Sequence, residues 1–290
     1  MIVADTATGA FEANRPRLTR LAYRMLGSVS EAEDMVQDAW LRWRGVDAAT
    51  ISDSAGWLVR TTSRLCLDRL KSARARREAY VGPWLPEPLI EDIAEDPLER
   101  AEDVSVAFLL ALERLSPLER AVFLLHDVFE AGYPQVAETL GRSEAACRQL
   151  AARARDHVKD ARPRFTVKDD EAARLAAAFM DATNRQDWAA LAQVLTEDAV
   201  MITDGGGKRK AALRPMIGRD DILLLLKGLS SRAPWPPPGE IRPARINGYP
   251  GAILTDAEGV TTLAFQPGPD GRIEAIYSVR NPDKLGHLDR

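Results

Sequence analysis

Residues 133–157 hold the pattern that most constrains the fold of this chain. Apolar side chains recur at helical spacing before Gly141-Arg142, and again between Cys147 and Val158. The dipeptide breaks the period, and Ser143 then supplies an N-cap for a second helix. Two helices joined by so tight a turn predict either a helix-turn-helix that enters the DNA major groove or an ordinary helical hairpin.

The second of these helices carries its charges on a separate stripe. Arg148, Arg155 and Lys159 recur at helical spacing away from the apolar face, and basic residues outnumber acidic ones in residues 141–164. An apolar back and a basic front suit a recognition helix, because the front meets phosphates. A solvated basic face would look the same, so this segment alone leaves both interpretations open.

Length and composition frame the rest of the chain. Its 290 residues predict two or three domains, and 46% hydrophobic with 28% charged residues is usual for a globular protein. The net charge is −4, but basic residues concentrate in residues 60–80 and acidic ones in residues 81–104. Such blocks indicate local partners of opposite sign.

Cysteine content and hydropathy bear on location. Cys66 and Cys147 are isolated on apolar helical faces, which fits a reducing compartment and predicts no metal site. Residues 1–10 show no leader pattern, and apolar runs such as Ile222–Leu226 are far too short to span a bilayer. We therefore expect a cytoplasmic protein with no membrane partner.

Residues 11–80 are predicted to be helical throughout. An apolar stripe up to Leu26 predicts a first helix, and Ser30-Glu31-Ala32-Glu33 is interpreted as a capping box that starts a second one. A third helix is predicted over residues 54–77, with basic residues along its second half. The acidic face of the second helix and the basic end of the third would ordinarily be solvated surfaces.

The sequence of this block suggests more than solvated surfaces. The run AEDMVQDAWLRW, followed by GWLVRTTSRLCLDRLKSARARRE, resembles region 2 of the extracytoplasmic-function (ECF) group of bacterial RNA polymerase sigma factors. The resemblance implies that Asp34, Gln37 and Asp38 bind the clamp helices of the polymerase β′ subunit. It also implies that the next helix binds and opens the −10 promoter element. Melted strands need cations along their backbone, here Arg60, Arg64, Arg69, Lys71 and Arg74.

One position departs from the family pattern. Many members carry Asn where this chain has Arg64, near the pocket for a flipped −10 base. The family's base preference at that position is therefore not carried over.

Residues 81–104 are rich in proline and acid and are expected to form a linker. A solvated connector is the simplest interpretation. The resemblance implies instead an acidic connector that threads the basic nucleic-acid channel of the polymerase. Trp84-Leu85-Pro86-Glu87-Pro88 is similar to the signature of a sigma subgroup with an extra C-terminal domain, and its prolines suit an extended segment that docks on another domain.

Residues 105–164, which include the opening stretch, resemble region 4 of the same family, the reader of the −35 element. Ser116-Pro117 with Glu119 predicts a helix start with proline at its first position. Base contacts are expected from the start of the second helix of the helix-turn-helix, that is from Ser143, Glu144, Arg148 and Gln149. Phosphate contacts are expected from Arg142, Arg153 and Arg155.

Residues 168–290 change to a different pattern. Helices are predicted at 169–183, 188–195 and 220–229. Strands are predicted at 199–203, 241–246, 251–255, 260–265 and 273–279. Helices followed by strands predict an α+β cone with a curved antiparallel sheet.

This last part resembles a SnoaL-like domain, the cone shared with ketosteroid isomerase and polyketide cyclases. Asp204-Gly205-Gly206-Gly207-Lys208 and Asn281-Pro282-Asp283-Lys284-Leu285 match two motifs of the subgroup already indicated by the linker. The resemblance implies an intramolecular switch in which the glycine loop contacts the linker and the C-terminal tail modulates that contact. The implied regulatory residues are Trp84, Leu85, Pro86, Asp204, Gly205, Gly206, Gly207, Lys208, Asn281, Pro282, Asp283 and Lys284.

A cone of this type admits another interpretation. The fold often holds a small apolar ligand, and some relatives are enzymes with a carboxylate base, for which Asp198 or Asp204 qualifies. No acid–base constellation accompanies them, because His287 is the first histidine of this part. We expect no enzymatic activity, no cofactor and no metal, and leave open an unknown small ligand in the cone.

The predicted fold is two all-α helical domains followed by an α+β cone, with domains at 1–80, 105–165 and 168–290 and a linker at 81–104. The predicted function is a sigma factor that binds the β′ clamp and β flap of core RNA polymerase, directs initiation at promoter DNA, and is modulated by its own cone. The alternative is a ligand-responsive helix-turn-helix regulator. Such a regulator has no need for the acidic and basic helices of residues 11–80.

Overall fold

The computed structural model describes residues 2–47, 50–91, 105–159, 169–232 and 239–288. The chain forms two compact units, one of Met1–Glu78 with Phe108–Arg162 and the other of Ala79–Ala107 with Pro163–Arg290. The first half of the predicted linker, residues 81–91, thus belongs to the second unit, and residues 92–104 lie outside the described residues. No helix in the described ranges is long and apolar enough to cross a membrane.

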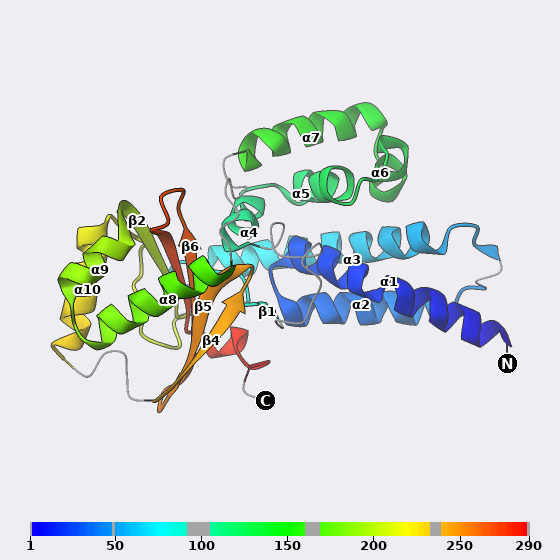
Figure 1. Ribbon diagram of the computed structural model, residues 1–290. Coiled ribbons are helices and arrows are strands. Elements are labelled where there is room, and N and C mark those ends of the chain that lie inside the picture. The colour runs from blue at the N-terminus through cyan, green and yellow to red at the C-terminus, as the bar shows by residue number, and fades with distance from the viewer. Residues whose placement is uncertain (1, 48–49, 92–104, 160–168, 233–238, 289–290) are drawn as a thin grey trace. The chain divides into compact units, whose positions relative to one another are not determined.

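The first unit is helical, as predicted (Figure 1). Its long helices are α1 (Ile2–Leu26), α2 (Val29–Arg44) and α3 (Ser54–Glu78). After α4 (Val106–Glu113), which begins in the second unit, come α5 (Pro117–Phe123), a π-helical turn (Leu124–Val128), α6 (Tyr133–Leu140) and α7 (Glu144–Val158).

Helix α2 begins earlier than the predicted capping box. Its N-cap is Ser28, not Ser30, and the Ser28 Oγ accepts a hydrogen bond from the Glu31 N–H at 3.0 Å. Gly27 adopts a left-handed φ of 67°, so α1 ends and the chain re-enters a helix at once. The prediction was wrong because this turn contains two serines that could cap α2. The left-handed conformation of Gly27 places Ser28, the first of them, at the N-cap position.

Helices α6 and α7 form the predicted helix-turn-helix. Gly141 ends α6 with a left-handed φ of 61°, and the Ser143 Oγ accepts from the Ala146 N–H at 3.2 Å to cap α7. Upstream, Ser116 and Glu119 form a reciprocal capping box with Pro117 at the first helical turn, also as predicted. The side of α7 that packs inward consists of Cys147, Leu150, Ala151, Ala154 and Val158.

The second unit is a sheet partly wrapped by helices. The helices are α8 (Asp169–Asn184), α9 (Trp188–Val194) and α10 (Arg219–Ser230), with α8 packed on β5 and β6 and α10 on β2. The strands are β1 (Ile90–Glu91), β2 (Leu195–Asp204), β3 (Met216–Ile217), β4 (Gly239–Ile246), β5 (Tyr249–Asp256), β6 (Gly259–Pro267) and β7 (Ile273–Val279). Their order in the sheet is β1-β4-β5-β6-β7-β2-β3. The predicted fold class, helical domains followed by an α+β cone, is confirmed.

The sheet differs from the prediction in two respects. Strands β2 and β7 pair in parallel, whereas a fully antiparallel sheet was expected. Such a pair cannot be joined by a hairpin, and here α10 and strands β3–β6 intervene. Strands β1 and β3 were not predicted, because two residues each are too short to show an alternating pattern.

Candidate nucleic-acid interface and linker anchor

The polar face of α2 presents the residues expected to bind polymerase. Asp34, Gln37 and Asp38 are exposed, while Met35, Val36, Ala39 and Trp43 are buried on the opposite side. Leu41 follows Asp34 by seven residues and Asp38 by three, so it lies on the same exposed face. Its side chain is 55% exposed. The sequence analysis missed Leu41, although an apolar residue within a polar stripe was the available signal.

The cations of α3 do not form one cluster. Arg60 and Arg64 share a helical face and reach the C-terminal end of α6. The Arg64 Nε donates to the Thr139 carbonyl at 2.9 Å and its Nη2 to the Glu138 carbonyl at 3.0 Å, while the Arg60 Nε lies 3.7 Å from the Glu138 carboxylate. These contacts occupy helix-terminal carbonyls that lack partners within α6.

The remaining cations of α3 are placed differently. Arg69 forms an ion pair with Glu31 of α2 at 2.9 Å, and Lys71 pairs with Asp68 one turn away at 2.8 Å. The side chain of Arg74 lies outside the described part of the chain. The structure therefore brings Arg60 and Arg64 together and separates Arg69 from them.

The expected base-reading residues lie at the exposed N-terminal end of α7. Ser143, Glu144, Arg148 and Gln149 are all exposed, and the Arg148 Nη1 lies 3.1 Å from the Glu144 Oε2 across one turn. Arg142 is also exposed. The site thus offers acceptor and donor groups side by side, as base edges require.

The arginines further along α7 are held by acids of the same unit. Arg153 pairs with Glu119 at 3.2 Å, and Arg155 pairs with Asp127 at 2.6 Å and donates to the Tyr133 hydroxyl at 3.2 Å. The hydrogen bonds to Asp127 and Tyr133 raise the pKa of the Arg155 guanidinium. Cys147 is buried on the inner face, and burial raises the pKa of its thiol, so its expected packing role agrees with an unreactive thiol.

In the second unit, the three signature motifs meet at Asp204, whose side chain is fully buried. Its Oδ1 accepts from the Tyr80 hydroxyl at 2.5 Å. Its Oδ2 accepts from the Leu85 N–H at 2.8 Å and from the Lys284 Nζ at 2.7 Å. One carboxylate thus joins residues of the linker, the glycine loop and the C-terminal tail.

Lys284 is the second centre of this anchor. It is 7% exposed, and its Nζ also donates to the Leu85 carbonyl at 2.5 Å. The ammonium lies 4.3 Å from the centre of the Trp84 ring and 4.8 Å from that of Tyr80, which are cation–π distances. Burial and the bond to Asp204 raise the pKa of the Tyr80 hydroxyl, so it stays protonated and donates.

The rest of the tail extends the same contact. Asn281 donates from its amide to the Tyr80 hydroxyl at 2.8 Å, and its own Oδ1 accepts from the Asp283 N–H at 3.1 Å. His287 lies 2.9 Å from the Pro88 carbonyl. Lys208 and Asp283 form an ion pair at 2.6 Å, but both side chains are more than half exposed. Pro86 and Pro88 are buried within this unit.

The glycines of the loop permit this approach. A Cβ on Gly206 would lie 2.2 Å from the Asn281 amide nitrogen, and one on Gly205 would lie 2.1 Å from the Arg209 carbonyl. Gly206 and Gly207 also have left-handed φ values of 58° and 71°. Side chains at these positions would separate the loop from the tail and from Val81.

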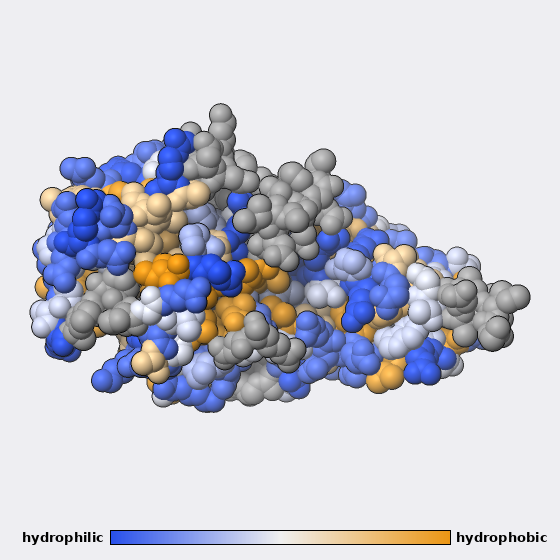
Figure 2. All heavy atoms as spheres, turned by 60° about the horizontal axis from the view of Figure 1, so that its bottom comes forward, coloured by the Kyte–Doolittle hydropathy of each residue, from blue (hydrophilic) through white to orange (hydrophobic). Residues whose placement is uncertain are grey.

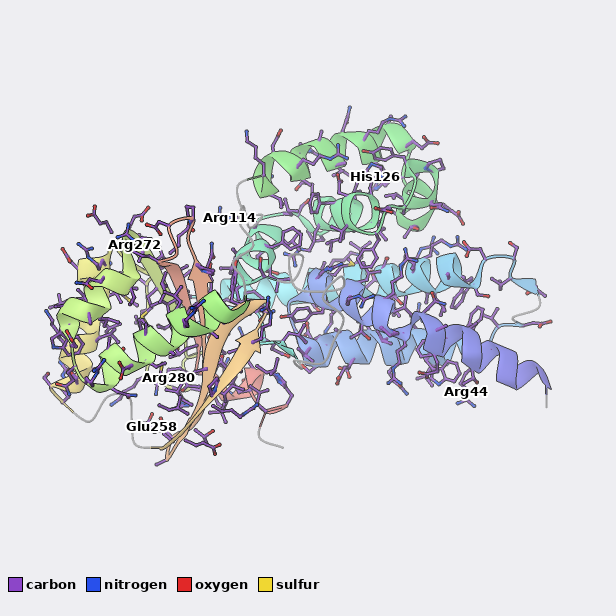
Figure 3. All side chains as sticks on the ribbon, in the orientation of Figure 1. Arg44, Arg114, His126, Glu258, Arg272 and Arg280 are labelled. Atoms are coloured by element: carbon purple, nitrogen blue, oxygen red, sulfur yellow. The ribbon has the colours of Figure 1, made fainter. Side chains whose placement is uncertain are left out.

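An ion network that the sequence analysis missed holds the loop beyond its glycines. Arg209 is almost fully buried and reaches Asp256 and Glu258, while Arg280 donates to Glu258 at 3.2 Å and to the Lys210 carbonyl at 2.7 Å. Figure 3 shows Arg280 and Glu258 at the same end of the sheet. Burial, together with the charge of Arg209, lowers the pKa of Arg280.

Apolar side chains pack together in the interior of the cone. Side chains around Phe179, Met201 and Leu263 leave a cavity of about 10 Å³, room for about one water molecule. Asp198 is exposed and Asp204 is fully bonded, so neither expected carboxylate faces that cavity. Figure 2 shows apolar side chains on the surface of the second unit. This unit also has an open groove of about 550 Å³, lined by residues that include Leu213 and Leu224.

Comparison with known proteins gives these sites a context. The chain matches the family models of Sigma-70 region 2 over residues 10–76 and Sigma-70 region 4 over residues 105–158. It is 40% identical to the ECF RNA polymerase sigma factor SigJ of Mycobacterium tuberculosis over 95% of this chain and 92% of SigJ. It is 34% identical to the probable ECF RNA polymerase sigma factor SigI of the same species over 98% of this chain and 96% of SigI.

A solved structure agrees with the sequence matches. The crystal structure of Mycobacterium tuberculosis SigJ aligns with a TM-score of 0.79 at 36% identity, over 96% of this chain and 98% of that one. These relatives favour a sigma factor over the alternative of a free-standing helix-turn-helix regulator, and they confirm the predicted family. The chain belongs to the ECF RNA polymerase sigma factors and directs transcription as a sigma subunit.

Proposed function

We propose that α2 binds core RNA polymerase on the clamp helices of its β′ subunit, through Asp34, Gln37, Asp38 and Leu41. The exposure of Leu41 in the middle of a polar face supports a protein interface, because burial of such a side chain stabilises a complex by about 1.5–3 kcal/mol. The acidic residues around Leu41 would orient α2 on its partner and increase the rate of association.

The test is titration of core polymerase with labelled protein. Leu41→Ala is expected to weaken binding by about tenfold or more. Leu213→Ala, which removes a leucine that is 74% exposed on the second unit, is the matched control and should bind normally. Equal affinity of the two variants would exclude Leu41 from the interface.

For the −10 element, the residues proposed to hold the melted strand are Arg60, Arg64, Arg69, Lys71 and Arg74. Arg64 already donates two hydrogen bonds to carbonyl oxygens, so its guanidinium is in a geometry that binds acceptors. To be bound by Arg64, a DNA phosphate would have to replace the α6 carbonyl oxygens as the acceptor of these hydrogen bonds. Arg64→Ala should reduce the salt dependence of binding to a forked promoter by about one phosphate contact. An unchanged salt slope would exclude that contact.

For the −35 element, the exposed end of α7 is proposed to read bases through Ser143, Glu144, Arg148 and Gln149. Arg142, Arg153 and Arg155 would bind phosphates, and the β flap would carry this domain. Arg148→Ala is expected to cost about 1–3 kcal/mol at one base pair of the element. Initiation from a set of −35 variants measures this, and a uniform loss would instead mark Arg148 as a phosphate contact.

The cone is proposed to control the sigma factor in cis by holding residues 80–88. The observation that supports this most strongly is the buried Asp204 carboxylate, bonded at once to Tyr80, Leu85 and Lys284. The linker is proposed to enter the polymerase. Residues 80–88 cannot do so while the cone holds them. The test is promoter-dependent transcription by chains that lack residues 168–290 or only residues 281–290. Unchanged output from both truncations would refute the proposal.

The account needs no catalysis by this chain, and we propose none for the cone. The protein is proposed to act in the cytoplasm, where its polymerase transcribes.

A further inference from the structure

A side chain outside the recognition helix contacts two of its arginines. Tyr133 is at the start of α6, on the first helix of the helix-turn-helix. The Arg148 guanidinium lies 5.6 Å from the centre of the Tyr133 ring, and the Arg155 Nη2 donates to the Tyr133 hydroxyl at 3.2 Å. Arg148 and Arg155 are two helical turns apart on α7, so one tyrosine spans the stripe between them.

Tyr133 is itself held in place. Its ring stacks on His126, with centroids 3.9 Å apart and planes inclined by 30°. The His126 Nδ1 lies 2.8 Å from the Ala131 carbonyl, and because a carbonyl can only accept, this nitrogen carries the proton. His126 lies in the π-helical turn before α6 and is labelled in Figure 3, near α7. A stacked and anchored ring gives the two arginines a fixed surface.

The two arginines are each restrained from a second side. The Glu144 carboxylate holds Arg148 at 3.1 Å, and the Asp127 carboxylate holds Arg155 at 2.6 Å. Both arginine side chains remain about half exposed, at 55% and 44%. They are therefore oriented but accessible, which is the state in which a long flexible side chain loses least entropy on binding.

We propose that Tyr133 is a positioning residue for −35 recognition: its ring orients Arg148 toward a base edge and its hydroxyl orients Arg155 toward a phosphate. This inference rests on the proposed −35 role of α7. Part of the sequence discrimination of α7 would then come from Tyr133, a residue of the neighbouring helix α6.

Two substitutions separate the two contacts. Tyr133→Phe keeps the ring under Arg148 and removes the bond to Arg155, so binding should weaken by about two- to fivefold at every −35 sequence, with discrimination unchanged. Tyr133→Leu removes both contacts, so discrimination at the base pair read by Arg148 should also fall by about two- to fivefold. The measurement is open-complex formation by the holoenzyme on promoters that differ at single −35 positions.

Controls keep the outcome interpretable. Tyr277→Phe, which deletes another bonded hydroxyl in the second unit, should leave −35 binding unchanged, and equal thermal midpoints of the variants exclude unfolding. In the Arg148→Ala background, Tyr133→Leu should cause no further loss of discrimination, because the two residues act as one unit. Normal discrimination by Tyr133→Leu, where Arg148→Ala has lost it, would overturn the positioning role. Normal discrimination by Arg148→Ala itself would instead overturn the proposed base contact.

Discussion

At the scale of single residues, burial distinguishes two ion pairs that look alike in the sequence. Asp204–Lys284 and Lys208–Asp283 both join the glycine loop to the tail, but the first is buried and the second is exposed. A buried charge that loses its partner is costly, whereas an exposed pair contributes about 0–1 kcal/mol. The motifs place all four residues, and the structure shows which pair matters for stability.

Asp204→Asn should therefore destabilise the second unit strongly. The variant leaves the Lys284 ammonium buried without a counter-charge, and the free energy of unfolding should fall by about 3–5 kcal/mol. Lys208→Met is the matched control and should change it by about 1 kcal/mol or less. Urea unfolding followed by tryptophan fluorescence checks both, and equal effects would contradict the difference in burial.

Buried tyrosines predict a loss of stability at high pH. Burial raises the pKa of Tyr249 from 10.0 to about 12, and it also raises the pKa of Tyr80 and Tyr277. The folded state favours the neutral phenol, so this stability is complete below pH 10 and is lost as the pH rises from 10 to 12. The thermal midpoint of the second unit should fall over that interval, and Tyr249→Phe should reduce the fall. An unaltered pH profile would show that Tyr249 ionises without cost.

At the scale of elements, prediction from the sequence succeeded where patterns are long. The helix-turn-helix with its cap at Ser143, the cap of α5 at Ser116, and the five longer strands were all predicted. The start of α2, the two short strands and the parallel β2–β7 pair were not, because each depends on a backbone conformation or a distant pairing. For the same reason Arg60 and Arg64 could be named, but their contact with α6 could not.

The glycine loop allows a test of close approach. In Gly206→Ala the new methyl would meet the Asn281 amide in an already left-handed backbone, so the tail should be displaced. Hydrogen exchange at the Leu85 and Asp283 amides, both bonded in the anchor, should accelerate. Gly228→Ala is the matched control, since nothing lies within 4 Å of its Cβ, and helix propensity predicts a gain of up to about 1 kcal/mol. Unchanged exchange at these two amides in Gly206→Ala would show that the loop accommodates the methyl group without displacing the tail.

At the scale of the whole molecule, the chain combines the DNA-binding regions of a sigma factor with a cone that holds part of the linker joining them. The described part of the predicted linker, residues 81–91, belongs to the cone's unit and adds strand β1 to its sheet. Composition marked this segment as a connector because it is rich in proline and acid. Its packing depends on the distant Asp204 and Lys284, which composition does not reveal and which only the resemblance of the three motifs to the sigma subgroup indicated.

The buried Asp204–Lys284 pair is the contact through which we expect the cone to control the sigma factor. The most direct test is transcription by reconstituted holoenzyme from one cognate promoter, with Lys284→Met, Lys208→Met and a chain without residues 281–290 compared at saturating sigma. Lys284→Met and the truncation are expected to change the output in the same direction, and Lys208→Met is expected to match the unsubstituted protein. An output from Lys284→Met equal to that of the unsubstituted protein, while the truncation changes it, would contradict the claim.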